Sequence, residues 1–100
     1  MGTESSTEAL LLRLRMLLPD LRKRYSIDTL EIFGSRARAE ADDKSDLDIL
    51  VTFSETPDLL ILISLENELS EELGLPVDVV MRRALKPRLR DRILREAIPV

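Results

Sequence analysis

The chain has 100 residues, of which 44% are hydrophobic and 34% are charged, and its formal net charge is −4. This composition is typical of one small globular domain and not of a disordered segment. The chain contains neither cysteine nor histidine. Disulfides, thiol nucleophiles, zinc sites built from these residues and serine–histidine–aspartate catalysis are therefore excluded. The net acidity argues against direct binding of duplex DNA.

Segments that would direct the chain to a membrane are not evident. The longest apolar run, Leu59 to Ile63, is far shorter than the ~20 residues that a membrane-spanning helix needs. The opening residues Met1 to Glu4 lack the basic and then apolar pattern of a secretory signal. We therefore expect a cytoplasmic protein without a membrane partner.

Hydrophobic periodicity predicts alternating helices and strands. In chain order we expect a leucine-rich helix from about Ser5 to Arg24, a strand over Ile27–Phe33, one or two helical turns over 35–40, a polar loop over 41–45, a strand over Leu47–Phe53, a helix over Pro57–Leu73, a strand over Val77–Met81 and a helix over Lys86–Ala97.

Several residues predict where the helices begin and end. Ser5 with Glu8 forms a possible capping box, and Pro19 either kinks the first helix or starts a second short one. Thr56 is the expected N-cap of the central helix, with Pro57 at its first position and Gly74 after its end. The elements fit one domain over residues 1–100, with a small three-stranded sheet flanked by helices, an α+β fold.

Two acidic residues open the second strand. Asp46 and Asp48 are two positions apart, so their side chains point to the same face of a strand. Two carboxylates that close repel each other unless a cation lies between them, and oxygen ligands suit Mg²⁺ or Mn²⁺. Alternatively, Asp46 ends a polar loop and Asp48 is a solvated strand residue.

A glycine–serine pair follows the first strand directly. Gly34 allows the backbone to approach a phosphate closely, Ser35 adds a hydroxyl donor and Arg36 adds a positive charge. The alternative is an ordinary turn with a solvated arginine.

A third acidic residue lies within an apolar strand. Asp78 is flanked by Val77 and Val79, and a carboxylate in a mostly buried strand needs a partner or a metal ion. Alternatively it faces solvent from an edge strand.

The three features together resemble the minimal nucleotidyltransferases of the DNA polymerase β superfamily. The resemblance rests on Phe33-Gly34-Ser35-Arg36-Ala37-Arg38, Ser45-Asp46-Leu47-Asp48, Pro76-Val77-Asp78-Val79 and the segments Leu85–Arg90 and Ile93–Ala97, and it extends from about residue 28 to the end of the chain. It implies a palm-like nucleotidyltransferase fold.

The resemblance also implies roles for these residues. Gly34 and Ser35 would hold the β- and γ-phosphates of a nucleoside triphosphate, expected to be ATP. Asp46 and Asp48 would carry two divalent ions, and Asp78 would ligate the catalytic ion and help to activate the attacking hydroxyl. Two such ions stabilise the attacking and leaving oxygens of an in-line displacement. Arg36 would contact the triphosphate.

Free-standing members of this family resemble the antitoxins of two-gene prokaryotic modules, whose partner is a HEPN-domain RNase toxin. The resemblance implies neutralisation of the toxin by binding, by transfer of AMP from ATP to a toxin tyrosine, or by both. A transferase acting on a small molecule such as an aminoglycoside is a further alternative, which the lack of an acceptor-binding domain disfavours.

Two segments of the sequence are relevant to the binding of a partner. Apolar residues cover every side of the first turn of the central helix at Leu59–Ile63, which predicts either an interface or a turn buried under the first helix. The segment 82–95 has a net charge of +6 and either guides a nucleotide or acidic partner or forms a solvated face. The acceptor is expected on a separate chain or on a second copy in a homodimer.

Overall fold

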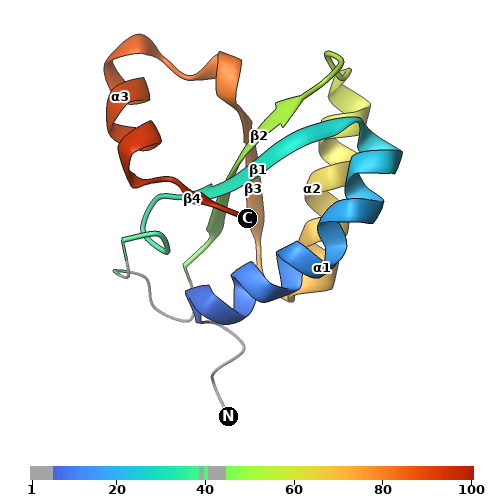
Figure 1. Ribbon diagram of the computed structural model, residues 1–100, viewed down its shortest axis with the longest axis horizontal. Coiled ribbons are helices and arrows are strands. Elements are labelled where there is room, and N and C mark those ends of the chain that lie inside the picture. The colour runs from blue at the N-terminus through green and yellow to red at the C-terminus, as the bar shows by residue number, and fades with distance from the viewer. Residues whose placement is uncertain (1–5, 39, 41–44) are drawn as a thin grey trace.

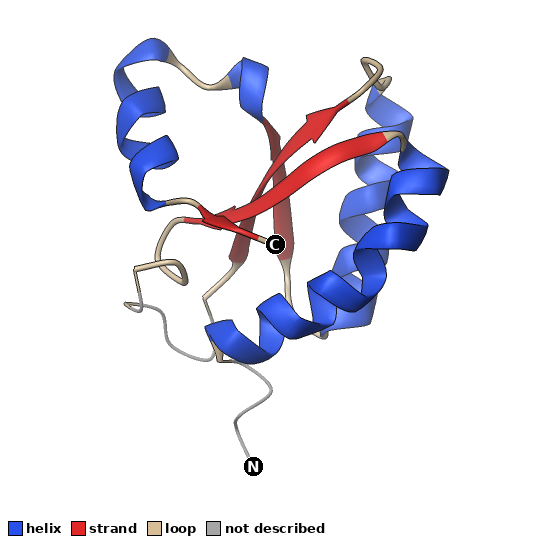
Figure 2. Cartoon of the chain, viewed as in Figure 1, coloured by secondary structure: helices blue, strands red, loops and turns tan. Residues whose placement is uncertain are grey.

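A computed structural model describes residues 6–38, 40 and 45–100. It is built around a mixed four-stranded sheet of order β3-β2-β1-β4, with α1 and α2 on one face and α3 on the other (Figures 1 and 2). The elements are α1 (Thr7–Tyr25), β1 (Ile27–Phe33), β2 (Leu47–Phe53), α2 (Leu59–Leu73), β3 (Val77–Met81), the 3-10 helix η2 (Arg82–Ala84), α3 (Pro87–Glu96) and β4 (Ile98–Pro99).

The α+β prediction is confirmed, and the sheet has one strand more than we expected. β1 pairs antiparallel with β2 and with β4, whereas β2 pairs parallel with β3. β4 was not predicted because it has only two residues, one of them Pro99. Its position is fixed by the chain end, where the Val100 N–H donates to the Leu30 carbonyl at 3.0 Å.

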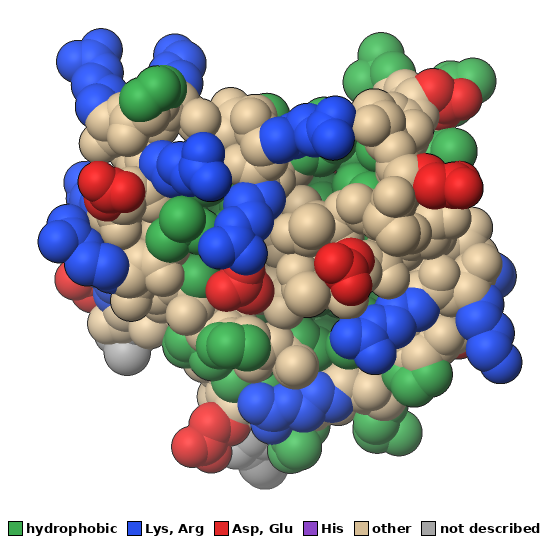
Figure 3. All heavy atoms as spheres, turned by 45° about the horizontal axis from the view of Figure 1, so that its top comes forward, with side chains coloured by type: hydrophobic (Ala, Val, Ile, Leu, Met, Phe, Trp, Pro, Cys, Tyr) green, Lys and Arg blue, Asp and Glu red, His purple; other side chains and the backbone are tan. Residues whose placement is uncertain are grey.

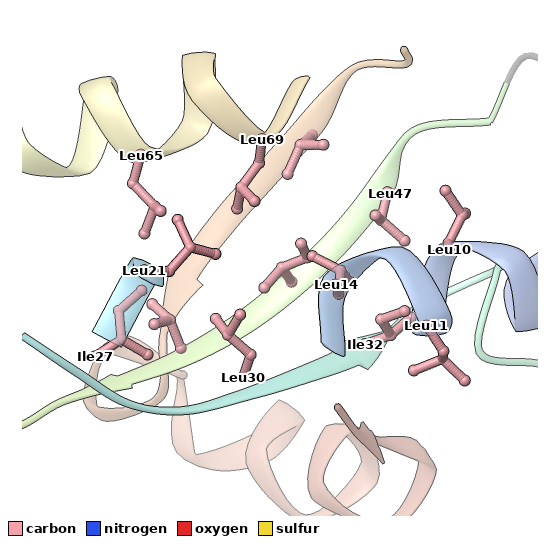
Figure 4. Close-up of a cluster of buried hydrophobic side chains, with 13 residues drawn as sticks. Leu10, Leu11, Leu14, Leu21, Ile27, Leu30, Ile32, Leu47, Leu65 and Leu69 are labelled. Carbon is pink, nitrogen blue, oxygen red and sulfur yellow. The ribbon is translucent and has the colours of Figure 1, made fainter. Parts of the chain in front are cut away.

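The hydrophobic core lies between the sheet and the first two helices. Figure 4 shows leucines of α1 and α2 pointing onto β1 and β2, with α3 on the far side of the strands. In β2 the core residues Leu47, Ile49 and Val51 alternate with residues of the opposite face, Asp48 among them. The core therefore packs against one face of the sheet, and the opposite face carries Asp48 together with the buried Leu50.

The helix boundaries differ from the prediction in detail. α1 is continuous through Pro19, and its N-cap is Ser6, whose hydroxyl accepts from the Ala9 N–H; Ser5 lies outside the described residues. α2 begins two residues later than predicted because Asp58, not Thr56, caps it by accepting the Ile61 N–H at 2.9 Å. The carboxylate of Asp58 is an acceptor as good as the threonine hydroxyl.

The remaining boundaries agree closely with the prediction. Gly74, at φ +73°, forms the C-cap of α2 as expected. α3 lies within one residue of its predicted ends. Residues 34–38 form turns and not a helix, with the Arg38 N–H donating to the Gly34 carbonyl at 3.2 Å.

The first turn of α2 is largely exposed. Leu59 and Leu60 are 70% and 73% exposed, and Ile63 is 44% exposed. Hydrophobic side chains protrude at the start of α2 in the upper right of Figure 3. This turn is therefore not covered by α1. No helix in the described part of the chain is long and apolar enough to pass through a membrane.

Replacement of a core leucine of α2 should destabilise the fold that carries the site. Leu65 is fully buried, and Leu65→Ala is expected to lower the free energy of unfolding by about 2–5 kcal/mol because it leaves a cavity. Urea denaturation measures the change. Leu60→Ala, on the exposed face of the same helix, is the control and should have little effect. Equal losses in both variants would contradict this placement of the core.

Candidate active site

The turn after β1 lies directly against the second strand. Phe33 pairs with Asp48 in the antiparallel ladder, so Gly34 comes next to that carboxylate. A Cβ added to Gly34 would lie only 2.3 Å from Asp48 Oδ2, and the backbone there has φ +80°. Only glycine combines this conformation with this approach. The glycine of the predicted phosphate turn is thus required by its contact with a predicted metal ligand.

The three predicted carboxylates come from neighbouring positions on two strands. Asp48 and Asp78 are direct partners in the parallel ladder between β2 and β3. Asp46 immediately precedes β2, and the side chains of Asp46 and Asp78 are exposed while Asp48 is half-buried. In β3, Asp78 follows the buried Val77 and is turned away from the core. The sheet therefore brings the acidic residues to one edge on its open face.

The pKa of Asp48 is affected by burial and by several charged side chains. Burial raises the pKa of Asp48 above its ordinary value, and the negative charges of Asp78 and Asp46 raise that pKa further. Arg38 opposes this effect, while Glu96 adds to it. Charged side chains of both signs therefore act on Asp48. Burial is the main cause of this shift, and the positive charge of Arg38 only partly offsets the effects of burial and of the neighbouring carboxylates.

The acidic residues do not close into a ligand cage. Within residues 6–38, 40 and 45–100 no group of three acidic side chains is close enough to hold one metal ion, and the carboxylates of Asp46, Asp48 and Asp78 accept no hydrogen bond. The joint coordination of metal by these residues stays a prediction. The donor set fits a hard divalent cation, because oxygen ligands with excess negative charge attract Mg²⁺.

An anion-binding group lies beside the acidic residues. The Gly34 N–H donates to Glu96 Oε2 at 2.7 Å, and Arg38 Nη1 donates to the two oxygens of Glu96 at 2.9 and 3.0 Å. Burial alone raises the pKa of Glu96, but these bonds outweigh burial and lower it overall. The turn therefore stabilises a negative charge directly next to Asp48.

The two other residues of the predicted phosphate turn have different surroundings. The Ser35 hydroxyl forms no hydrogen bond within the described residues, and its side chain is half-buried. Arg36 is only 3% exposed, and its Nε and Nη2 donate to the Ser45 carbonyl at 3.2 and 2.8 Å. The guanidinium of Arg36 thus supports the backbone just before Asp46 and does not extend into the turn.

Sequence analysis missed two residues of this site. Arg38 lies within the motif but received no role; its distance of four residues from Gly34 is the signal, because a turn bonded from residue i to i+4 brings both together. Glu96 is more than 50 residues away along the chain. Glu96 lies in the segment Ile93–Ala97 that carries part of the resemblance, but nothing local in that segment indicates a contact with Gly34. A second signal is an acidic residue at the C-terminal end of a helix, where the dipole disfavours negative charge.

Removal of the buried arginine should weaken the fold. Arg36→Met leaves the Ser45 carbonyl without its charged donor, so we expect a loss of about 1.5–3 kcal/mol in the free energy of unfolding. Urea denaturation is the measurement. Arg22→Met is the matched control, because Arg22 also donates to a backbone carbonyl, that of Asp28, from an exposed position. If both variants lose the same amount, Arg36 has no special supporting role.

Asp48 should make stability depend on pH in a defined direction. A pKa that is raised in the folded state means that stability falls as pH rises from the unfolded pKa of Asp48 through its folded pKa. Without divalent metal, Asp48→Asn should therefore be more stable than the parent protein at neutral pH. The gain should vanish below about pH 4, where the aspartate is protonated in both states.

Paired denaturation curves at several pH values test this prediction. Asp91→Asn, at an exposed position on α3, provides the control for removal of one negative charge. A parent protein that is more stable than Asp48→Asn at neutral pH would contradict the prediction.

Comparisons with known proteins show the family to which the chain is related. Residues 14–100 match the family described as nucleotidyltransferase domain. The chain is 46% identical over 81 residues to the protein adenylyltransferase MntA of Thermococcus cleftensis, covering 81% of this chain and 82% of that protein. A solved structure of a minimal nucleotidyltransferase is 44% identical and has a TM-score of 0.81, covering 95% of this chain and 96% of that one.

A more distant structure shares the fold. It is a tri-AMPylated HEPN toxin of Shewanella oneidensis in complex with an MNT antitoxin, matched with a TM-score of 0.67 at 22% identity, over 90% of this chain and 70% of that one. The family match and the closer relatives cover most of the sequence. The chain therefore belongs to the nucleotidyltransferase domain family, among the minimal nucleotidyltransferases related to MntA.

Proposed function

We propose that this protein is a metal-dependent protein adenylyltransferase that moves AMP from ATP to a hydroxyl, a tyrosine in our proposal, of a HEPN-domain toxin and so acts as its antitoxin. One observation carries the proposal. Gly34 and Arg38 bind a negatively charged carboxylate immediately beside Asp48, whose pKa is raised by burial and by the charges of Asp78 and Asp46. A phosphate site next to a cation site is what the transfer of a nucleotide from its magnesium complex requires.

The turn after β1 is the part that would bind the phosphates. The Gly34 N–H and the Ser35 hydroxyl would donate to the β- and γ-phosphates. Arg38 is the cation that reaches the same point, since it shares the Glu96 carboxylate with Gly34. Arg36, which we expected to contact the triphosphate, is engaged with the Ser45 backbone and would instead fix the approach to Asp46.

The acidic residues would hold the divalent ions. Asp46, Asp48 and Asp78 would bind two Mg²⁺ ions, for which Mn²⁺ could substitute, and these ions would supply charge neutralisation at the attacking and leaving oxygens. The acceptor oxygen attacks the α-phosphorus, the bond from that phosphorus to the bridging oxygen breaks, and pyrophosphate leaves. Asp78 would help to withdraw the proton of the attacking hydroxyl.

The exposed apolar turn of α2 supports a protein partner. Leu59, Leu60, Ile61 and Ile63 are all more than a third exposed on consecutive sides of this turn. A small globular protein seldom leaves such a group in water unless it docks against another surface. The relatives are consistent with a protein acceptor, since MntA of Thermococcus cleftensis is a protein adenylyltransferase and the Shewanella oneidensis complex contains an AMPylated toxin.

The activity is tested by the mass of the toxin after incubation with this protein, ATP and Mg²⁺. We expect the toxin to gain one or more AMP units on tyrosine and its RNase activity to fall. Asp46→Asn/Asp48→Asn should abolish the mass gain, because the metal ligands lose their charge. Asp28→Asn/Asp91→Asn, which removes the same charge at exposed positions away from the site, is the control.

Other outcomes identify other functions. A toxin that is inhibited without a change in mass would show a non-catalytic antitoxin that acts by binding alone. Transfer of label from ATP to an aminoglycoside, with the toxin unmodified, would show a small-molecule nucleotidyltransferase. Either result would overturn the proposal.

A further inference from the structure

The phosphate-binding donors of the turn are already occupied by a group of the protein itself. Both oxygens of the Glu96 carboxylate are bound, one by the Gly34 N–H and Arg38 together and the other by Arg38 alone. The side chain of Glu96 is only 14% exposed. A carboxylate, like a phosphate, is an anion whose oxygens accept hydrogen bonds from a backbone N–H and a guanidinium. It therefore fills the position that a nucleotide would use.

The location of Glu96 in the fold is unfavourable apart from this contact. It is the last residue of α3, where the helix dipole opposes a negative charge. Its charge also raises the pKa of Asp48, so it adds to the repulsion within the acidic group. The bonds from Gly34 and Arg38 are the contacts that offset these costs.

α3 can release this side chain without disturbing the core. No residue of α3 is buried, and the helix lies on the face of the sheet opposite the hydrophobic core (Figure 4). Lys and Arg side chains gather over α3 in the upper left of Figure 3. β4 continues directly from α3 and holds the chain end through its pairing with β1. A rotation of the Glu96 side chain alone would free the two donors.

We infer that Glu96 is an internal substitute for a nucleotide phosphate, which keeps the Gly34 turn and Arg38 in their binding geometry in the free protein and must be displaced when the nucleotide binds. This inference rests on the proposed function, because it takes these donors to be the phosphate site. Glu96 thereby lowers nucleotide affinity and stabilises the free protein. The two effects have opposite signs, which distinguishes displacement from a purely structural role.

Calorimetric titration of the full chain with AMP-PNP and Mg²⁺ tests the inference. Glu96→Gln keeps the size of the side chain but loses the charge that competes with phosphate. We expect its Kd for AMP-PNP to be about tenfold lower than that of the parent protein, since bonds from Gly34 and Arg38 to a neutral amide are weaker than those to the carboxylate and cost less to break. The free variant should at the same time have a lower Tm than the parent protein.

Glu40→Gln is the matched control. Glu40 forms an ion pair with the same arginine, between Arg38 Nε and Glu40 Oε1 at 3.0 Å, but it does not contact Gly34. The substitution Glu40→Gln removes one negative charge from beside Arg38, as Glu96→Gln does. It should change the Kd for AMP-PNP much less than Glu96→Gln. If Glu96→Gln folds poorly, Glu96→Asp serves instead, because its shorter side chain cannot span both donors and should also bind AMP-PNP more tightly.

The outcomes separate the inference from the proposed function. Binding to the parent protein with equal or weaker binding to Glu96→Gln would overturn the displacement of Glu96 and leave the nucleotide site intact. An equal increase in affinity for AMP-PNP in Glu96→Gln and Glu40→Gln would also overturn the displacement of Glu96. The increase would then follow from the removal of any negative charge near Arg38. No binding of AMP-PNP to any of the three proteins would refute the proposed function itself.

Discussion

The site depends on the close approach of the turn after β1 to the beginning of β2. Gly34 has no side chain, and the space that a Cβ would need is taken by Asp48 Oδ2, 2.3 Å from that position. This contact places a backbone N–H and Arg38, which bind an anion, beside carboxylates that attract a cation. A magnesium nucleotide carries both kinds of charge. The antiparallel pairing of Phe33 with Asp48 thus produces the charge pattern that the substrate in our proposal would need.

The two faces of the sheet have different roles: one packs in the core that stabilises the fold, and the other carries the candidate site. Leucines of α1 and α2 pack on one face and make that side a continuous apolar core (Figure 4). The other face carries Asp48, Asp78 and the contact with Glu96, under a helix that buries none of its own residues. Charged groups on this face can therefore rearrange around a ligand while the core stays fixed. Arg36 is buried, and its guanidinium donates to the Ser45 carbonyl, so it fixes the backbone that leads to Asp46.

Sequence reasoning was most successful where a local pattern determines the structure. The β-branched content of Ile27–Phe33 predicted β1, and the alternation of apolar and polar residues predicted β2 and β3. Gly74 was predicted as a helix cap from its place at the end of the apolar pattern, and its positive φ agrees with that role. Local patterns could not choose between Thr56 and Asp58 as the cap of α2, since both are good acceptors. β4 has no pattern of its own and forms only because the chain returns to β1.

The candidate site could be predicted only in part, because some of its contacts follow local sequence patterns and others depend on the tertiary fold. The two-residue spacing of Asp46 and Asp48 predicts that both side chains lie on one face, and in the structure Asp48 lies in β2 with Asp46 immediately before it. Glu96 reaches Gly34 only through the tertiary fold, and the burial of Arg36 depends on packing that no local motif reports.

The most direct test follows the backbone amides of the labelled protein by NMR while AMP-PNP is added, first without and then with Mg²⁺. The account predicts that the amides of Gly34, Ser35 and Arg38 shift together with those of Asp48 and Asp78, and that the shifts at the two aspartates require Mg²⁺. Shifts confined to another surface, or a response at Gly34 without one at Asp48 and Asp78 when Mg²⁺ is present, would contradict the account.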